Sequence, residues 1–401
     1  MSESTTIEAE VIQLRESIGH LLRRRVVEAI ETVLEEELDA ALGTSRYERS
    51  EERRGYRNGH QPRRVTTATG TAELSVPRAR LEGEDGKTEE FRSEILPRYQ
   101  RRTNEVDEAI LGAYLAGTNT RRIAKALAPL LGTEHLSKSA VSRIVGRLKE
   151  QFTAWEERDL SDERYAVLFL DGMHLKVRMA RRVVSVPVLA VLGITEDGRK
   201  QLVSLALAVS ESGASWSGVV LGLQRRGLES PKLVVADGHK GLAQAISAWP
   251  NADVQRCTVH KWRNLEKTCP KHARRELKRD YDRIVQASDG LAARKAYDTF
   301  VKKWSPLCPQ AVVSLEEAGE ALLTFYAYPK EMWKSLKTTN SIENLNREFR
   351  RRTKTQSSFS TEEAALTLLF GLVASGQIRM RRGDGHEHVA KLFESQTERA
   401  A

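Results

Sequence analysis

Two short stretches decide the fold: residues 166–172 read AVLFLDG, and residues 233–238 read LVVADG. Each is an apolar run that ends in Asp-Gly. A continuous apolar run of this length, flanked by a turn signal, predicts a strand buried on both faces of a sheet. A carboxylate next to such a strand is costly unless it is hydrated, paired or bound to a metal. Asp171 and Asp237 are therefore the first candidates for a functional site.

The sequence around these strands predicts a mixed α/β domain. Strands are expected over 165–177, 183–195 and 201–209, followed by a helix (216–228), a strand (232–236), a helix (241–249) and a strand (254–258). These are the elements of a ribonuclease H-like fold. Residues 261–333 lose strand character, and further helices are expected from Asn340 and over 361–376. We predict an α/β ribonuclease H-like catalytic core with a mixed sheet, interrupted by an all-α insertion.

The N-terminal part predicts helices and one hairpin. Residues 11–43 carry leucines and isoleucines at helical spacing, which favours a long helix for packing or dimerisation. Residues 44–103 are rich in Arg, Thr and Gly, and alternation on both sides of Gly70 predicts a small basic β-hairpin. Its arginines have two interpretations: contacts to DNA phosphates, or an ordinary solvated loop.

Residues 104–152 predict three helices: one over 104–116, one capped near Asn119 or Thr120, and one starting at Ser137. The third helix offers Lys138, Ser139 and Arg143 on the face opposite its apolar residues. Two short helices followed by a basic third helix are typical of a helix-turn-helix, whose last helix enters the major groove of DNA. The alternative is an ordinary three-helix bundle.

A third acid is expected on the helix that follows the sequence TTNSIE (338–343). With Asn340 as the N-cap, Glu343 falls at the third helical position, where a capping-box glutamate has a purely structural role. Glu348 is the alternative on the same helix. A basic run lies downstream and is a candidate phosphate-binding segment: Arg347, Arg350, Arg351, Arg352 and Lys354. The residues alone favour Glu343 over Glu348 only modestly.

Carboxylates from neighbouring strands lie close enough to repel one another, unless a divalent cation neutralises them. Mg²⁺ suits such a set because it takes a few carboxylates and keeps its other positions for water and substrate phosphate. A second metal hypothesis is zinc held by Cys257, His260, Cys269 and His272, although this spacing is not that of a usual zinc finger. The edge formed by His260, Lys261, Arg263 and Asn264 fits a contact to DNA equally well.

Composition agrees with a nucleic-acid partner. The chain has 401 residues and a formal net charge of +9, with 64 Lys and Arg against 55 Asp and Glu. The excess is positioned: residues 255–310 contain 14 basic and 6 acidic residues, and residues 330–382 contain 11 and 5. Three cysteines are too few for a disulfide framework and suit a reducing cytosol. No apolar stretch is long enough to span a bilayer, and no secretory signal is present, so a soluble intracellular protein is expected.

The chain resembles the IS256 family of bacterial transposases, relatives of the Mutator-like transposases of eukaryotes. The likeness rests on DGMHLKVR (171–178), VADGHKGL (235–242), QRCTVHKWRN (255–264) and TTNSIENLNREFRRRTK (338–354), with RNG (57–59) and VPR (76–78) before them. The resemblance implies a DDE triad of Asp171, Asp237 and Glu343, all three also metal ligands, with two Mg²⁺ ions for which Mn²⁺ substitutes. It also implies cleavage and strand transfer of double-stranded DNA at terminal inverted repeats, a homodimer, and a cytoplasmic, nucleoid-associated location.

The expected organisation follows. Residues 1–103 form the helix and hairpin region, 104–155 the helix-turn-helix, 156–260 the first part of the core, 261–333 the helical insertion, 334–380 the second part of the core with the glutamate helix, and 381–401 a tail. Two other functions remain open: a non-catalytic DNA-binding regulator derived from a transposase, and another two-metal nuclease of the same fold.

Overall fold

The computed structural model describes residues 3–48, 50–51, 53–83, 87–118, 120–131, 138–179, 182–354, 356 and 358–393. For residues 3–17, 120–121, 129–130, 138 and 240 it describes the backbone alone. The chain divides into two compact units, Met1–Arg147 and Leu148–Ala401, and each is described by itself. No helix in the described part of the chain is both long and apolar enough to cross a membrane.

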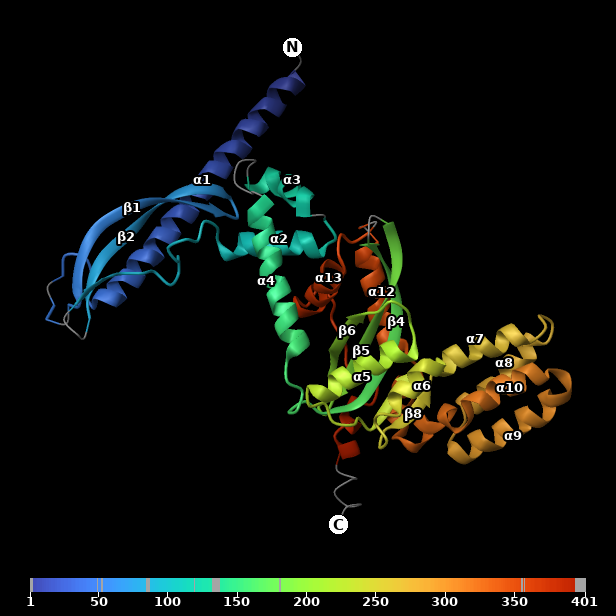
Figure 1. Ribbon diagram of the computed structural model, residues 1–401. Coiled ribbons are helices and arrows are strands. Elements are labelled where there is room, and N and C mark those ends of the chain that lie inside the picture. Colours follow the sequence, from blue (N-terminus) through green and yellow to red (C-terminus); the bar gives the residue numbers. More distant parts are fainter. Residues whose placement is uncertain are drawn as a thin grey trace. The chain divides into compact units, whose positions relative to one another are not determined.

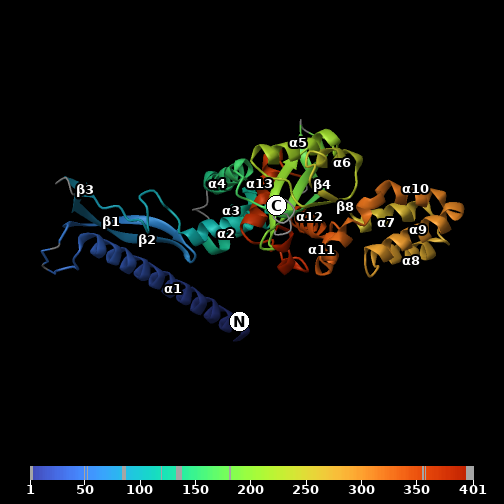
Figure 2. The same cartoon turned by 90° about the horizontal axis from the view of Figure 1, so that it is seen from below.

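The first unit begins with a long helix packed on a small antiparallel sheet (Figures 1 and 2). Helix α1 spans Glu3–Leu42, and the sheet contains β1 (Gly55–Thr67), β2 (Gly70–Glu82) and β3 (Thr88–Glu90) in that order. The predicted hairpin is confirmed, but its two strands are 13 residues each and so longer than expected. Leu34, Leu38 and Leu42, spaced four apart, are fully buried against the sheet, which fixes one face of α1.

Three helices complete this region, as the sequence predicts: α2 (Asn104–Leu115), α3 (Thr120–Leu131) and α4 (Lys138–Glu157). The predicted caps Asn119 and Ser137 lie outside the described residues. Buried Val141, Ile144 and Leu148 give α4 its inward face. The division between the two units falls within α4.

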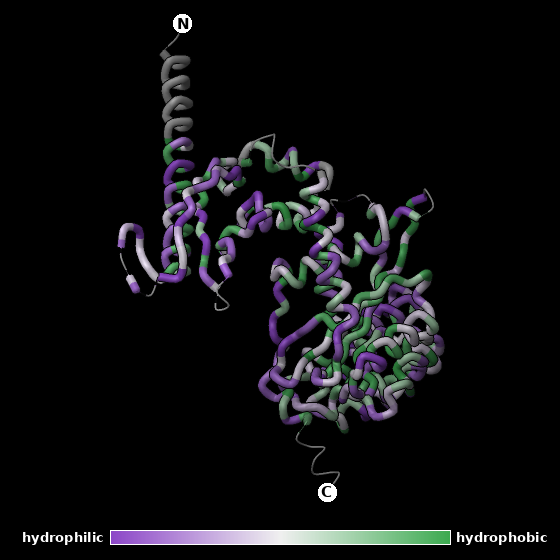
Figure 3. The backbone as a smooth tube through the Cα atoms, turned by 60° about the vertical axis from the view of Figure 1, so that its left-hand side comes forward, coloured by the Kyte–Doolittle hydropathy of each residue, from purple (hydrophilic) through white to green (hydrophobic). Residues whose placement is uncertain are grey.

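The second unit is built on a five-stranded mixed sheet with the order β6-β5-β4-β7-β8. Its strands are β4 (Tyr165–Met179), β5 (Arg182–Thr195), β6 (Lys200–Leu207), β7 (Leu233–Ala236) and β8 (Asp253–Arg256). β4, β5 and β6 form an antiparallel meander, whereas β7 and β8 run parallel to β4. Figure 3 shows many hydrophobic residues in this unit, whereas hydrophilic residues make up much of the hairpin of the first unit. The predicted strands and their order along the chain are confirmed.

Helices cover both faces of this sheet. On one face α5 (Gly213–Arg225) and α6 (Lys240–Ile246) bury Trp216, Val220 and Leu242 against Leu168 and Leu170 of β4. Helices α12 (Asn340–Thr353) and α13 (Glu362–Ala374) also contact the sheet strands, α12 mainly β4. Because side chains alternate along a strand, the odd-numbered residues of β4 from Val167 onward face away from α5.

The region between β8 and α12 is all helical, as predicted. It contains α7 (Thr258–Thr268), α8 (Arg274–Val285), α9 (Gly290–Leu307) and α10 (Pro309–Ala318), three short 3-10 helices (Gly319–Leu322, Thr324–Ala327 and Lys330–Met332) and α11 (Trp333–Leu336). It has its own core, with Leu277, Tyr281, Phe300 and Trp304 buried together. A last 3-10 helix, His386–His388, follows α13.

Candidate active site

Asp171 and Asp237 occupy matching positions on two neighbouring strands. The parallel pairing of β4 with β7 ends at Leu170 opposite Ala236, and in each case the next residue along the chain is the aspartate. The apolar run ends at Asp171, but the strand does not, in agreement with the strand predicted over 165–177. β4 continues to Met179, paired with β5, because Met173, Leu175 and Val177 keep the buried alternation going. Of the two pairings that β4 makes, only the one with β7 ends at the carboxylates.

Gly238 completes the turn after Asp237. Its φ of +86° lies in the region that favours glycine, and a Cβ there would meet the Arg256 guanidinium at less than 2 Å. The backbone N–H of His239 then donates to Asp237 Oδ1 at 2.9 Å. The glycine therefore sets a turn that holds the carboxylate in place.

Helix α12 carries Glu343 to the aspartates. Its N-cap is Thr339, not Asn340 as predicted, so Glu343 is one position later than a capping-box residue. The Thr339 hydroxyl donates to Glu343 Oε1 at 2.7 Å. One turn along the helix, Asn346 Nδ2 donates to Asp171 Oδ2 at 2.8 Å. This contact ties the glutamate helix to β4.

The pKa of Asp171 responds to its burial and to the charges of the other two acids. Burial raises the pKa of Asp171 to about 6, and the charges of Asp237 and Glu343 add to the rise, while the Asn346 hydrogen bond and the charge of His260 oppose it. A buried carboxylate beside two others is the arrangement that a divalent cation relieves.

Each of the three carboxylates has one oxygen held by the protein. Asn346 binds Asp171 Oδ2, His239 binds Asp237 Oδ1, and Thr339 binds Glu343 Oε1. Within the described part of the chain, no donor forms a hydrogen bond with the second oxygen of any of them. The acids are thus oriented through one oxygen each, and the second oxygen has no hydrogen-bond donor among the described residues.

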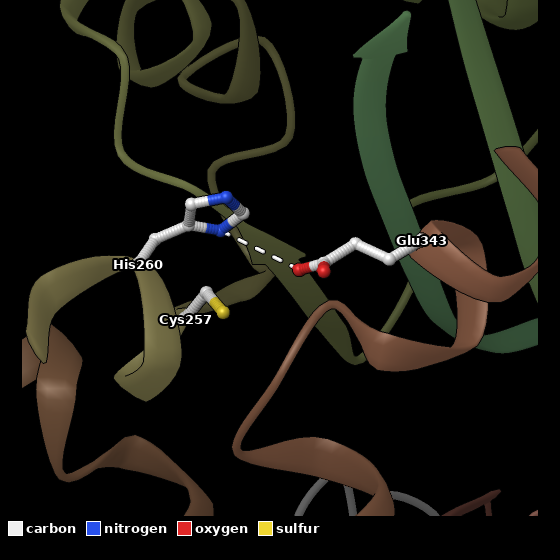
Figure 4. A group of neighbouring side chains, drawn as sticks. All are labelled: Cys257, His260 and Glu343. Carbon is white, nitrogen blue, oxygen red and sulfur yellow. Dashed lines mark ion pairs between the residues drawn. The ribbon is translucent and has the colours of Figure 1, made fainter. Parts of the chain in front are cut away.

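Cys257 and His260 lie beside Glu343 (Figure 4). His260 Nδ1 is 3.7 Å from Glu343 Oε1, and the Thr339 N–H donates to Cys257 Sγ at 3.3 Å. Burial opposes a charged Cys257, but hydrogen bonds with His260 and Thr339 outweigh it and lower the pKa of the thiol. The hydrogen bond with Cys257 raises the pKa of His260, which the charge of Glu343 reinforces. Ligand atoms of Cys257, His260 and Glu343 lie within 4.8 Å of one another.

The second Cys-x-x-His pair is elsewhere. Cys269 is buried in the core of the helical region beside Cys308, and its burial raises its pKa to about 11. His272 is exposed. The structure therefore does not bring together the four residues of the zinc hypothesis. The side chain that lies with Cys257 and His260 is Glu343.

One residue predicted to contact DNA is buried. The side chain of Lys261 is 2% exposed, and its ammonium donates to Glu317 Oε2 at 2.6 Å and to the Ser314 carbonyl at 2.7 Å. Arg256 binds the same glutamate at 2.9 Å. Both cations hold the pKa of Glu317 at about 2 against the effect of its burial. Lys261 fixes α7 to α10 and does not face solvent.

The other predicted DNA contacts are mostly at the surface. Exposed residues are Ser139, Arg143, Arg263, Asn264, Arg347, Arg350, Arg351 and Lys354. Arg352 is half-buried and donates to Gln377 at 3.3 Å, and His260 is half-buried next to Glu343. The side chain of Lys138 lies outside the described residues. On α12, Arg347, Arg350 and Lys354 follow Glu343 at intervals of three or four residues and so share its side of the helix.

Sequence reasoning missed two residues of this site. Thr339 and Asn346 are both fully buried, and each donates to one of the acids. A signal was present, because Asn346 lies three residues after Glu343 and so on the same side of α12. Its role depends on β4, which is 175 residues away along the chain.

The chain matches the model of the family described as Transposase, Mutator family, over residues 1–379. The chain belongs to the Mutator family of transposases. It is 38% identical over 378 residues to the transposase for insertion sequence element ISRM5 of Rhizobium meliloti, covering 92% of this chain and 91% of the relative. It is 35% identical over 367 residues to that of IS905 of Lactococcus lactis, covering 91% of each.

The IS256 type of this family is also represented. The transposase for insertion sequence element IS256 in transposon Tn4001 of Staphylococcus aureus is 33% identical over 340 residues, covering 84% of this chain and 85% of the relative. The resemblance drawn from the four sequence motifs is confirmed.

Proposed function

We propose that this Mutator-family protein is a DNA transposase of the DDE type, which binds terminal inverted repeats and catalyses strand cleavage and strand transfer with Mg²⁺. The proposal takes the five-stranded sheet as a ribonuclease H-like core and residues 261–333 as its insertion. One observation carries it: Asp171, Asp237 and Glu343 come from three separate segments, the charges of Asp237 and Glu343 act on Asp171, and each acid has one oxygen without a protein donor in the described chain.

The donor set fits Mg²⁺, because it consists of carboxylate oxygens with room left for water and phosphate. When bound, the metal would lower the pKa of a water and neutralise phosphate charge. The residues of the chain then have distinct tasks. Asn346, the His239 N–H and Thr339 orient the three acids. The exposed arginines on the Glu343 side of α12 hold the phosphodiester through charge-assisted hydrogen bonds.

The reaction balances without a protein nucleophile. The oxygen of water bonds to phosphorus at the element end, and the P–O3′ bond breaks to leave a 3′-hydroxyl and a 5′-phosphate. The 3′-hydroxyl oxygen then bonds to a phosphorus of the target strand, and the target's own 3′-oxygen leaves and takes up a proton. No serine, tyrosine or cysteine is required as a covalent intermediate.

The proposal also assigns α2, α3 and α4 to a helix-turn-helix. Ser139 and Arg143 are exposed on the first two turns of α4, opposite the buried Val141 and Ile144. The N-terminal residues of a recognition helix are those that reach base edges. Arg147 is instead tied to Asp107 of α2 at 2.6 Å and serves the packing of the helices.

The test is Mg²⁺-dependent cleavage of a duplex that contains an element end. Glu343→Gln is compared with Glu348→Gln, a matched change on the same helix. Glu348 is ion-paired to Arg351 at 3.2 Å, and five residues of helix place it on a different side of α12 from Glu343. We expect Glu343→Gln to lose cleavage while it still binds the duplex, and Glu348→Gln to cleave like the wild type.

The opposite pattern would move the third acid to Glu348. Cleavage that survives in Glu343→Gln and also in Asp171→Asn would refute the proposed chemistry altogether.

A further inference from the structure

A groove of about 980 Å³ lies within the first unit, and eight arginines line it. They come from β1, β2, the segment after β3 and the start of α4: Arg63 and Arg64, Arg78, then Arg92, Arg98, Arg101 and Arg102, and Arg143. Among the described residues that line it, Glu90 is the one acid. Such a density of like charge in a concave surface creates a strong field for an anion.

Three of these arginines have no acidic partner. Among the described residues, no carboxylate lies within ion-pair distance of Arg92, Arg101 or Arg143, and all three are exposed. The acid Glu90 is outnumbered: the hydrogen bond from Arg78 lowers its pKa, and the charges of Arg98 and Arg92 lower it further. The groove therefore has cations left over after its own ion pairs are formed.

Arg63 builds the wall of the groove. Its guanidinium donates to the carbonyls of Leu96 at 3.1 Å and Gln100 at 2.7 Å, and also to that of Pro97. These bonds fold the segment after β3 back against β1. The backbone that carries the free arginines of that segment is thus held in place, and less ordering of this loop is needed when a ligand binds.

We infer that this groove binds the sugar-phosphate backbone of duplex DNA, independently of base sequence. The inference rests on the proposed function and extends it to a site outside the helix-turn-helix. Guanidinium groups match phosphate oxygens two at a time. Ala140 and Arg143 of α4 line the groove, so it is continuous with the helix proposed to enter the major groove. The DNA backbone that borders this major groove is the polyanion that would lie next to the arginine groove.

The exposed side chain of Tyr99 adds a hydroxyl group that can donate a hydrogen bond to a phosphate oxygen. It is 87% exposed at the groove, with the Arg98 guanidinium 6.0 Å from its ring centre. Tyrosine hydroxyls are among the groups that donate to DNA phosphates.

The experiment uses the full chain without divalent metal, so that binding is measured apart from cleavage. Arg92→Gln/Arg101→Gln is compared with Arg24→Gln/Arg46→Gln, which removes two exposed arginines of the same unit that do not line the groove. Each is titrated with an element-end duplex and with a scrambled duplex of equal length, over a range of salt. Circular dichroism and thermal melting check that the variants fold.

We expect the groove variant to bind both duplexes more weakly by the same factor, roughly 10- to 50-fold at ~0.1 M salt, with a salt slope smaller by about 2. The control pair should stay within about twofold of the wild type. Binding by the groove variant equal to that of the control would overturn the inference. A loss confined to the element-end duplex would also overturn it, because the groove would then read bases.

Two further outcomes separate this inference from its neighbours. If the groove variant loses binding to phosphatidylglycerol vesicles and keeps its binding to DNA, the groove takes a membrane surface and the inference is wrong. If the wild type binds both duplexes, the groove variant does not, and Mg²⁺ never produces cleavage, the groove inference stands and the proposed catalytic function fails.

Discussion

The carboxylate site of the second unit and the arginine groove of the first concentrate opposite charges in opposite surroundings. Asp171 is partly buried, and its pKa rises to about 6 because of burial and neighbouring acids. The groove arginines Arg92 and Arg101 are exposed, so water and salt screen them from one another. Repulsion between like charges is therefore far stronger at the partly buried acid site than in the exposed groove. The acid site therefore suits a small ion bound tightly, and the groove suits an extended polyanion bound reversibly.

The two regions also differ in how their charges are held. Each acid has its own single hydrogen-bond donor, so loss of one donor should alter one acid. In the groove, Arg63 secures a whole segment through three carbonyls, and Arg92, Arg101 and Arg143 have no carboxylate within ion-pair distance among the described residues. Precision of placement matters at the acids, and total charge matters in the groove.

The largest effect that would test this comparison is the loss of cleavage activity caused by the substitution Asn346→Ala. Without the amide, Asp171 loses its donor, and Mg²⁺-dependent cleavage should fall by about 10- to 100-fold with a higher requirement for Mg²⁺, as for other residues that orient metal ligands. The matched control is Asn344→Ala, an exposed residue of the same helix, which should cleave normally. The measurement is the cleavage rate against Mg²⁺ concentration. Equal rates for the two variants would mean that the orientation of Asp171 does not limit the reaction.

A second effect should appear in the stability of Asp171→Asn: the substitution should stabilise the metal-free protein although it removes an acid needed for cleavage. Asp171→Asn removes a carboxylate whose pKa rises on folding from 3.8 to about 6, which corresponds to about 3 kcal/mol. Because ionisation is harder in the folded state, the wild type loses this stability as pH rises from about 4 to about 6. The metal-free variant should therefore be more stable above pH 6 and similar to the wild type near pH 4.

Thermal melting of both chains across this pH range provides the measurement. Mg²⁺ should stabilise the wild type and have much less effect on the variant, because a ligand stabilises the state that binds it. If Asp171→Asn is destabilising at pH 7 without metal, Asp171 is not under electrostatic strain, and the contrast with the groove is lost.

How much of this was readable from the sequence depends on how local the information was. Apolar runs and their order along the chain predicted the strands and placed Asp171 and Asp237 next to each other, because β4 and β7 pair in the register that the two Asp-Gly motifs share. The choice of Glu343 over Glu348 came from the family resemblance. Burial was less accessible: Lys261 lies in a basic run, and its partner Glu317 is 56 residues away.

The groove was harder still to predict. Its arginines are contributed by four segments between Arg63 and Arg143, and each segment alone looks like a solvated basic loop. They converge only because β1 and β2 pair over their full length and Arg63 folds the segment after β3 against them. The sequence showed an excess of arginine here and left phosphate contact and solvation as equal interpretations.

The smallest expected effect is on the salt dependence of DNA binding, and it distinguishes an exposed cation from one that is buried in an ion pair. Arg263 and Lys261 are two residues apart on α7, yet Arg263 is exposed and Lys261 is 2% exposed. Arg263→Gln should reduce the salt slope of DNA binding by about 1, whereas Lys261→Met should leave the slope unchanged and lower the free energy of unfolding by about 1–3 kcal/mol through its lost hydrogen bonds. Binding titrations at several salt concentrations and denaturant unfolding measure the two quantities. A flattened slope in Lys261→Met would show that this ammonium leaves Glu317 for a phosphate when DNA binds, and the division between structural and DNA-facing charge in the helical region would then have to be redrawn.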